Sequence, residues 1–69
     1  MPLYIINRSK DDKNLNEVHT TNCNHLPSAE NRELLGYFNN AKEAVNYAKL
    51  HGWHDADGCY FCCNEAHHG

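Results

Sequence analysis

The sequence predicts a small α+β domain, with a two- or three-stranded antiparallel sheet and one main helix. Three observations lead to this prediction. The chain has only 69 residues, too few for two separate cores. Segments with strand composition surround one segment with helical periodicity. A domain of this length buries only about 60% of the surface that its unfolded chain exposes. We therefore expect a single domain over residues 1–69 whose core needs additional stabilisation.

Three segments have the composition of β-strands. Leu3–Asn7 is β-branched and aromatic, as strands usually are. Leu15–Thr20 alternates loosely between less polar and polar residues, and Leu34–Phe38 is apolar around Gly36, which marks a bulge or a close backbone approach. The polar segment Ser9–Asn14 between the first two strands predicts a turn connection.

The main helix is predicted between Asn40 and Gly52. Asn39 or Asn40 can cap its first turn, and Glu43 places negative charge where the helix dipole favours it. Gly52 supplies the left-handed residue that often follows a helix. Small apolar residues repeat at helical spacing, namely Ala41, Ala44, Val45 and Ala48. The helix should pack closely on the sheet, and residues 52–58 after it are expected to form a loop.

The charge balance limits the classes of partner. Six basic and nine acidic residues give a formal charge of −3, which argues against binding nucleic acid by bulk electrostatics. The basic residues Arg8, Lys10 and Lys13 are interrupted by Asp11 and Asp12, a pattern typical of a solvated turn. No apolar stretch approaches the roughly 20 residues of a membrane span, and the first residues lack the pattern of a signal peptide. We therefore expect a cytoplasmic protein with no membrane partner.

Cysteine and histidine residues occur in two close pairs with the spacing of a zinc site. Three residues separate His19 from Cys23, and two separate Cys59 from Cys62. Zinc prefers four sulfur and nitrogen ligands, typically delivered as two such pairs. In a reducing compartment such cysteines are more often metal ligands than disulfides. Gly58 helps a tight knuckle to form before the second pair. One Zn²⁺ would then join both ends of the domain. A thiol redox pair at Cys59 and Cys62 is the alternative.

Two further residues are alternative metal ligands. Cys63 can replace Cys62, because three residues separate it from Cys59, which suits a helical turn. His67 can supply the fourth ligand if His19 points away from the site. We expect Cys63 to be a small buried residue instead, and His67 to lie in a fraying C-terminal segment.

The motif order resembles the zinc-binding domain of the Ada-type DNA methylphosphotriester repair proteins. The resemblance covers residues 18–62 and is carried by the following segments: Val18–Cys23, Asn31, Gly36–Phe38, Ala41–Ala44, Gly52 and Cys59–Cys62. Related modules attached to some nuclease-like proteins look closer still, since they have histidine where the repair domain has its first cysteine. The resemblance implies that His19, Cys23, Cys59 and Cys62 are the four metal ligands.

One departure from that family changes the expected function. In the repair domain the first cysteine accepts the methyl group, and here the position is His19. An imidazole is a far poorer alkyl acceptor than a thiolate, and four protein ligands leave no open position on the metal. We expect a non-catalytic structural zinc module that presents a surface to a protein or nucleic-acid partner such as DNA. The alternatives are a zinc-thiolate alkyl acceptor and a thiol redox or metal sensor that uses Cys63.

Aromatic residues are expected to lie mostly in the core, because so small a domain must bury its large side chains. They are Tyr37, Phe38, Tyr47, Trp53, Tyr60 and Phe61. Tyr60 and Phe61 lie between two expected ligands and cannot both point inward, so the exposed one is the best candidate for contact with a partner.

Overall fold

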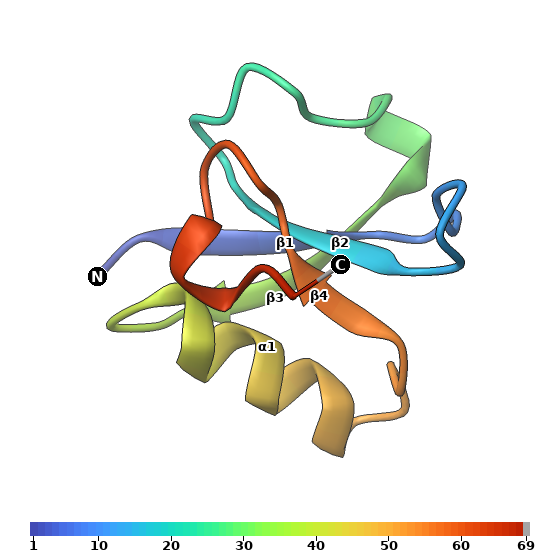
Figure 1. Ribbon diagram of the computed structural model, residues 1–69. Coiled ribbons are helices and arrows are strands. Elements are labelled where there is room, and N and C mark those ends of the chain that lie inside the picture. The colour runs from blue at the N-terminus through green and yellow to red at the C-terminus, as the bar shows by residue number, and fades with distance from the viewer. Residues whose placement is uncertain (69) are drawn as a thin grey trace.

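The computed structural model describes residues 1–68 and contains a four-stranded mixed sheet with one α-helix across one face (Figure 1). The strands are β1 (Leu3–Asn7), β2 (Asn16–Thr20), β3 (Arg32–Tyr37) and β4 (Ala56–Gly58). Their order in the sheet is β3-β1-β2-β4. The α+β class is confirmed. The expectation of two or three antiparallel strands is wrong, because a fourth strand is present and pairs in parallel with β2.

Strand β4 lies within the segment that was expected to be a loop. Its sequence, Ala56-Asp57-Gly58, contains no β-branched or aromatic residue, so its composition gives no sign of a strand. Pairing with β2 produces it instead, with Asn16 opposite Ala56 and Val18 opposite Gly58. All three residues of β4 are buried. Tertiary contacts, and not local preference, therefore decide the structure of this segment.

Strand β1 forms the centre of the antiparallel part of the sheet. It pairs with β2 through Ile5 and His19, and with β3 through Ile5 and Leu34. The register with β3 shifts between Tyr4 and Ile5, beside Gly36, whose φ of 130° suits glycine. The irregularity predicted from this glycine is therefore present.

Helix α1 (Ala41–Leu50) begins and ends at the residues that the sequence predicts. The side-chain oxygen of Asn40 accepts the backbone N–H of Glu43 at 3.0 Å, and the Glu43 carboxylate accepts the N–H of Asn39 at 3.2 Å. These reciprocal bonds satisfy two of the free donors at the helix start. At the other end Gly52 has a φ of 101°, and the Trp53 N–H donates to the Ala48 carbonyl at 3.0 Å.

The core lies between α1 and the sheet. The helix contributes the small buried residues predicted from its periodicity, Ala41, Ala44, Val45 and Ala48. The sheet contributes Tyr4, Ile6 and Val18, and the C-terminal segment contributes Cys59, Cys63 and Ala66. Two short 3₁₀ helices, η1 (Ala29–Asn31) and η2 (Asn64–Ala66), complete the fold. No helix in residues 1–68 has the length and apolar character of a membrane span.

The expectation that most aromatic side chains are buried is wrong. Phe38 and Trp53 are half-buried and pack against the core. The other four are exposed: Tyr37, Tyr47, Tyr60 and Phe61. The helix face that packs on the sheet consists of Ala41, Ala44, Val45 and Ala48, and these four rings lie outside that interface.

Gly58 is the position where the chain has least space for a side chain. A Cβ atom there would lie 2.5 Å from the Cys63 carbonyl oxygen and 2.9 Å from the Ala66 carbonyl carbon. We predict that Gly58→Ala lowers the free energy of unfolding by about 1–3 kcal/mol, the usual cost of overpacking. It should also speed hydrogen exchange of the Cys59 amide, which donates to the Val18 carbonyl at 2.9 Å.

Gly52→Ala is the matched control for this prediction. Nothing lies within 4 Å of a Cβ at Gly52, although its positive φ strains an alanine. This variant should lose some stability in a urea titration and keep the slow exchange of the Cys59 amide. Equal exchange in the two variants would show that Gly58 is not needed for close packing on β4.

Candidate metal centre

The parallel pairing of β2 with β4 brings the two expected ligand pairs together. Both strands run in the same direction and end at the same edge of the sheet. His19 lies near the end of β2, and Cys59 follows β4 directly. The Cys59 N–H extends the ladder by donating to the Val18 carbonyl at 2.9 Å. Residues that lie 40 positions apart in sequence therefore become neighbours.

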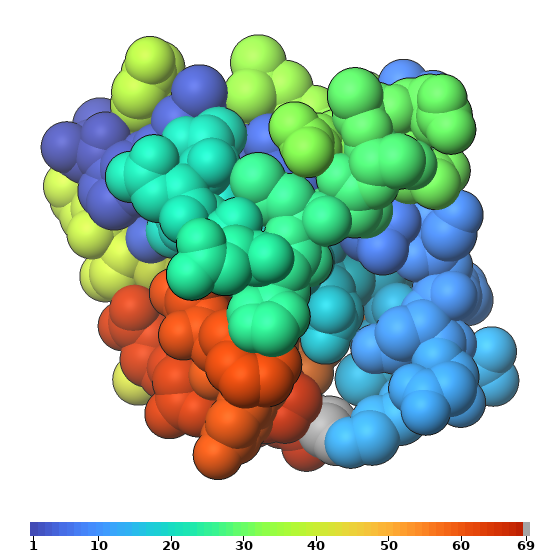
Figure 2. Space-filling view, turned by 90° about the horizontal axis from the view of Figure 1, so that it is seen from above, coloured from blue at the N-terminus to red at the C-terminus, as the bar shows by residue number. Residues whose placement is uncertain are grey.

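Two tight turns place the second member of each pair. After β2 the chain turns back, and the Cys23 N–H donates to the Thr20 carbonyl at 3.1 Å. After β4 the Cys63 N–H donates to the Cys59 carbonyl at 2.9 Å, which closes a turn that contains Cys62. Figure 2 shows the segment after β2 lying against the segment after β4 on one face of the molecule.

The four side chains form a compact cluster that can hold a metal ion. The ligand atoms of His19, Cys23, Cys59 and Cys62 all lie within 4.8 Å of one another. The Cys23 and Cys59 sulfurs are 3.9 Å apart, and the Cys62 sulfur is 3.8 Å from His19 Nδ1. A tetrahedral zinc site has sulfur–sulfur edges of about 3.8 Å and sulfur–nitrogen edges of about 3.6 Å, from its usual bond lengths. The Cys23–Cys59 and Cys62–His19 edges are close to these values.

Backbone amides point at the sulfur atoms of the cluster. The Thr20 N–H donates to Cys62 Sγ and the His25 N–H donates to Cys23 Sγ, both at 3.4 Å. Burial raises the pKa of the Cys23 and Cys59 thiols. The His25 N–H opposes this effect at Cys23, and the backbone amides of Cys62 and Phe61 oppose it at Cys59. Hydrogen bonds of this kind stabilise a thiolate, which is the form of cysteine that binds metals.

His19 presents a neutral nitrogen to the cluster. Its side chain is 1% exposed, and burial lowers its pKa, with further repulsion from His25 and Arg32. A lowered pKa keeps the imidazole neutral at physiological pH, and the neutral ring is the form that coordinates metals. The ring is therefore ready to bind without first losing a proton.

The two alternative ligands lie outside the cluster. Cys63 Sγ is 3.7 Å from Cys62 Sγ, but the group of mutually close ligand atoms does not include it. Its side chain is buried in the core, as expected, and burial raises the pKa of its thiol. A thiol in this environment is poorly suited to redox exchange, which proceeds through the thiolate.

His67 contacts β4 and not the cluster. Its Nδ1 is 2.9 Å from the Gly58 carbonyl oxygen and 3.3 Å from the Asp57 carboxylate. The next residue, His68, donates its backbone N–H to the same carboxylate at 2.9 Å. The expected fraying of this segment is therefore wrong for residues 67 and 68, because the buried Asp57 binds both of them.

Exposed aromatic rings lie beside the cluster. The rings of His25 and Phe61 are stacked with centroids 3.8 Å apart, and Tyr60 meets Phe61 edge-on at 5.3 Å. Tyr60 is 57% exposed and Phe61 is 66% exposed. We call these three residues the aromatic patch. One exposed ring was expected here, and two are found.

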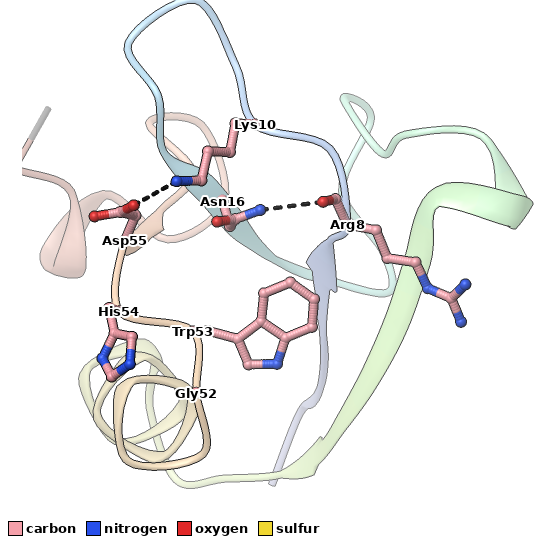
Figure 3. A pocket seen from close by; sticks show the side chains of 7 residues that line it. All are labelled: Arg8, Lys10, Asn16, Gly52, Trp53, His54 and Asp55. Carbon is pink, nitrogen blue, oxygen red and sulfur yellow. Dashed lines mark hydrogen bonds and ion pairs between the residues drawn. The ribbon is translucent and has the colours of Figure 1, made fainter.

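A hollow lies away from the cluster, at the opposite end of β2 (Figure 3). Its volume is about 300 Å³, and it is lined by Arg8, Lys10, Asn16, Gly52, Trp53, His54 and Asp55. Lys10 forms an ion pair with Asp55, and its hydrogen bond lowers the pKa of that carboxyl. The Arg8 guanidinium points out of the hollow and pairs with Glu33 at 3.0 Å. Two of the three cations of the predicted basic turn, Arg8 and Lys10, are thus each paired with a carboxylate.

The neighbouring cysteines Cys62 and Cys63 allow a matched test of the ligand set. We predict that Cys62→Ala weakens zinc binding by at least 100-fold, because it removes a ligand, whereas Cys63→Ala leaves zinc affinity nearly unchanged. The Cys63 variant should lose about 1 kcal/mol or slightly more in stability through its small cavity. Competition with a chromophoric chelator measures both affinities. The reverse ranking would assign the ligand to Cys63.

Comparisons of the chain with protein-family models, with curated proteins and with solved structures find no match.

Proposed function

We propose that this domain is a structural zinc module that has no catalytic activity and presents a surface to a partner. One observation carries the proposal: ligand atoms from two remote parts of the chain lie within 4.8 Å of one another. Two of these residues, His19 and Cys59, are almost fully buried. A buried imidazole beside three cysteine sulfurs is the donor combination that structural zinc sites use.

The donor set supports zinc as the metal. Three thiolates and one imidazole form one of the common structural zinc sets. Calcium and magnesium prefer oxygen ligands, and the cluster contains none. The two short edges, 3.9 Å between the Cys23 and Cys59 sulfurs and 3.8 Å between Cys62 Sγ and His19 Nδ1, also suit the tetrahedral geometry of zinc.

A structural role follows from the number of ligands and their places in the fold. Four protein ligands complete a tetrahedral zinc site and leave no position for water or substrate. The ligands come from β2, the segment after it and the segment after β4. Metal binding would therefore connect two parts of a domain whose helix offers only small side chains to the core, and would add its binding energy to folding.

The surface offered to a partner is the aromatic patch. Aromatic side chains are enriched at protein interfaces, and stacked rings can also accept nucleic-acid bases. The formal charge of −3 favours a protein, and three thiolates with one Zn²⁺ would make the domain more negative by one unit. A protein partner is therefore the better fit.

The resemblance to Ada-type domains is part of this proposal. The motif order implies that the two ligand pairs join at one metal, and the closeness of the four side chains agrees with that implication. The chemistry of the repair domain fits less well, because the position of its methyl-accepting cysteine is the buried His19.

Removal of the metal tests the proposal directly. We predict that the purified protein carries one zinc ion per chain in native mass spectrometry, and that a strong chelator unfolds it cooperatively, as seen by circular dichroism. Zinc should restore the fold, whereas magnesium should not. A folded chain at the metal-free mass would contradict the structural role.

Alkyl transfer is the competing function, since Cys23 and Cys62 are only half-buried. Both sulfurs accept backbone N–H groups, which reduces the charge available for attack on a methyl group. We predict that the zinc-loaded protein gains no methyl group from methylphosphotriester DNA, measured by intact mass. One added methyl on a single ligand cysteine would favour the alkyl acceptor instead.

A further inference from the structure

Glu17 lies next to the nitrogen of His19 that faces away from the sulfur atoms. The two residues are separated by one position in β2, so their side chains point to the same face of the sheet. The distance from Glu17 Oε1 to His19 Nε2 is 3.6 Å. The other ring nitrogen, Nδ1, is 3.8 Å from Cys62 Sγ. The imidazole therefore lies between a carboxylate and the cysteine cluster.

We propose that Glu17 is a positioning residue for the metal site: its carboxylate holds the Nε2–H of His19, so that Nδ1 is the nitrogen that binds the metal. A neutral imidazole carries one N–H and one lone pair. If the lone pair of Nδ1 points at the metal, the proton must be on Nε2. The Nε2–H can then donate a hydrogen bond to the Glu17 carboxylate. This inference rests on the proposed zinc site and adds the orientation of its only nitrogen ligand.

The usual surroundings of a metal-binding histidine support this role. A metal-binding histidine almost always donates its other N–H to a carboxylate, a carbonyl or water, which fixes the ring and makes the ligand more basic. The His19 ring is 1% exposed, whereas the Glu17 side chain is 31% exposed. Solvent has little access to the ring itself, so a partner from the protein is needed for a proton on Nε2.

Asp57 is the other carboxylate in this region, and it has different partners. It lies opposite Glu17 in the β2–β4 pairing. Its oxygens accept the His68 N–H at 2.9 and 3.2 Å and contact His67 Nδ1 at 3.3 Å. Asp57 therefore anchors the C-terminal segment. Glu17 is the carboxylate within ion-pair distance of His19.

Replacement of the carboxylate tests the role. We expect Glu17→Gln in the full chain to bind zinc 10- to 100-fold more weakly than the wild type in a chelator competition, the usual effect of losing such a partner. Glu30→Gln is the matched control, because Glu30 is an exposed carboxylate in η1, and it should bind zinc as the wild type does. Equal zinc affinity of Glu17→Gln and the wild type would overturn the proposal.

A measurement on the unaltered protein tests the orientation of the ring without any variant. In ¹⁵N-labelled, zinc-loaded protein, long-range ¹H–¹⁵N spectra should show a protonated Nε2 and a metal-bound Nδ1 for His19. A proton on Nδ1 with metal on Nε2 would overturn this inference while leaving the zinc site intact. A wild-type chain that binds no zinc would overturn both the inference and the proposed function, so the two failures are distinguishable.

Discussion

The parallel contact between β2 and the three-residue strand β4 is the interaction on which the rest of the structure depends. It extends the sheet by one strand and places Cys59 against β2, where its N–H donates to the Val18 carbonyl. This pairing is what places the segment with Cys23 beside the segment with Cys59 and Cys62. Gly58 permits it, because the turn after β4 and η2 pack directly on its backbone. The candidate metal centre is therefore a consequence of strand pairing.

The strand contact and the proposed zinc would support each other. Three residues of parallel pairing are weak alone, since short strands gain little from hydrogen bonds that water can also provide. The helix adds only Ala41, Ala44, Val45 and Ala48 to the core, and short side chains bury little apolar area. A metal bound by residues at both strand ends would prevent the strands from separating. In return, the strands hold the ligands close together before the metal binds.

Local signals in the sequence were enough to predict some parts of the molecule. Helix α1 was predicted from its caps and its alanine periodicity, and the two ligand pairs were predicted from their spacing. Strand β4 was not predictable, because Ala56-Asp57-Gly58 becomes a strand only through its neighbour. The contacts of His67 and His68 were also missed, since the buried Asp57 that they meet lies in that unpredicted strand. The role proposed for Glu17 needed the fold, because a predicted strand over Leu15–Thr20 does not show how close the Glu17 carboxylate lies to the His19 ring.

The central claim is that one zinc ion is held by three sulfurs and one nitrogen. X-ray absorption spectroscopy at the zinc edge of the loaded protein tests it most directly. We predict three sulfur atoms at about 2.3 Å and one nitrogen at about 2.0 Å. A first shell of four sulfur atoms would place Cys63 at the metal in place of His19, and a shell of oxygen and nitrogen alone would show that the cysteine cluster does not bind the zinc; either result would contradict the account.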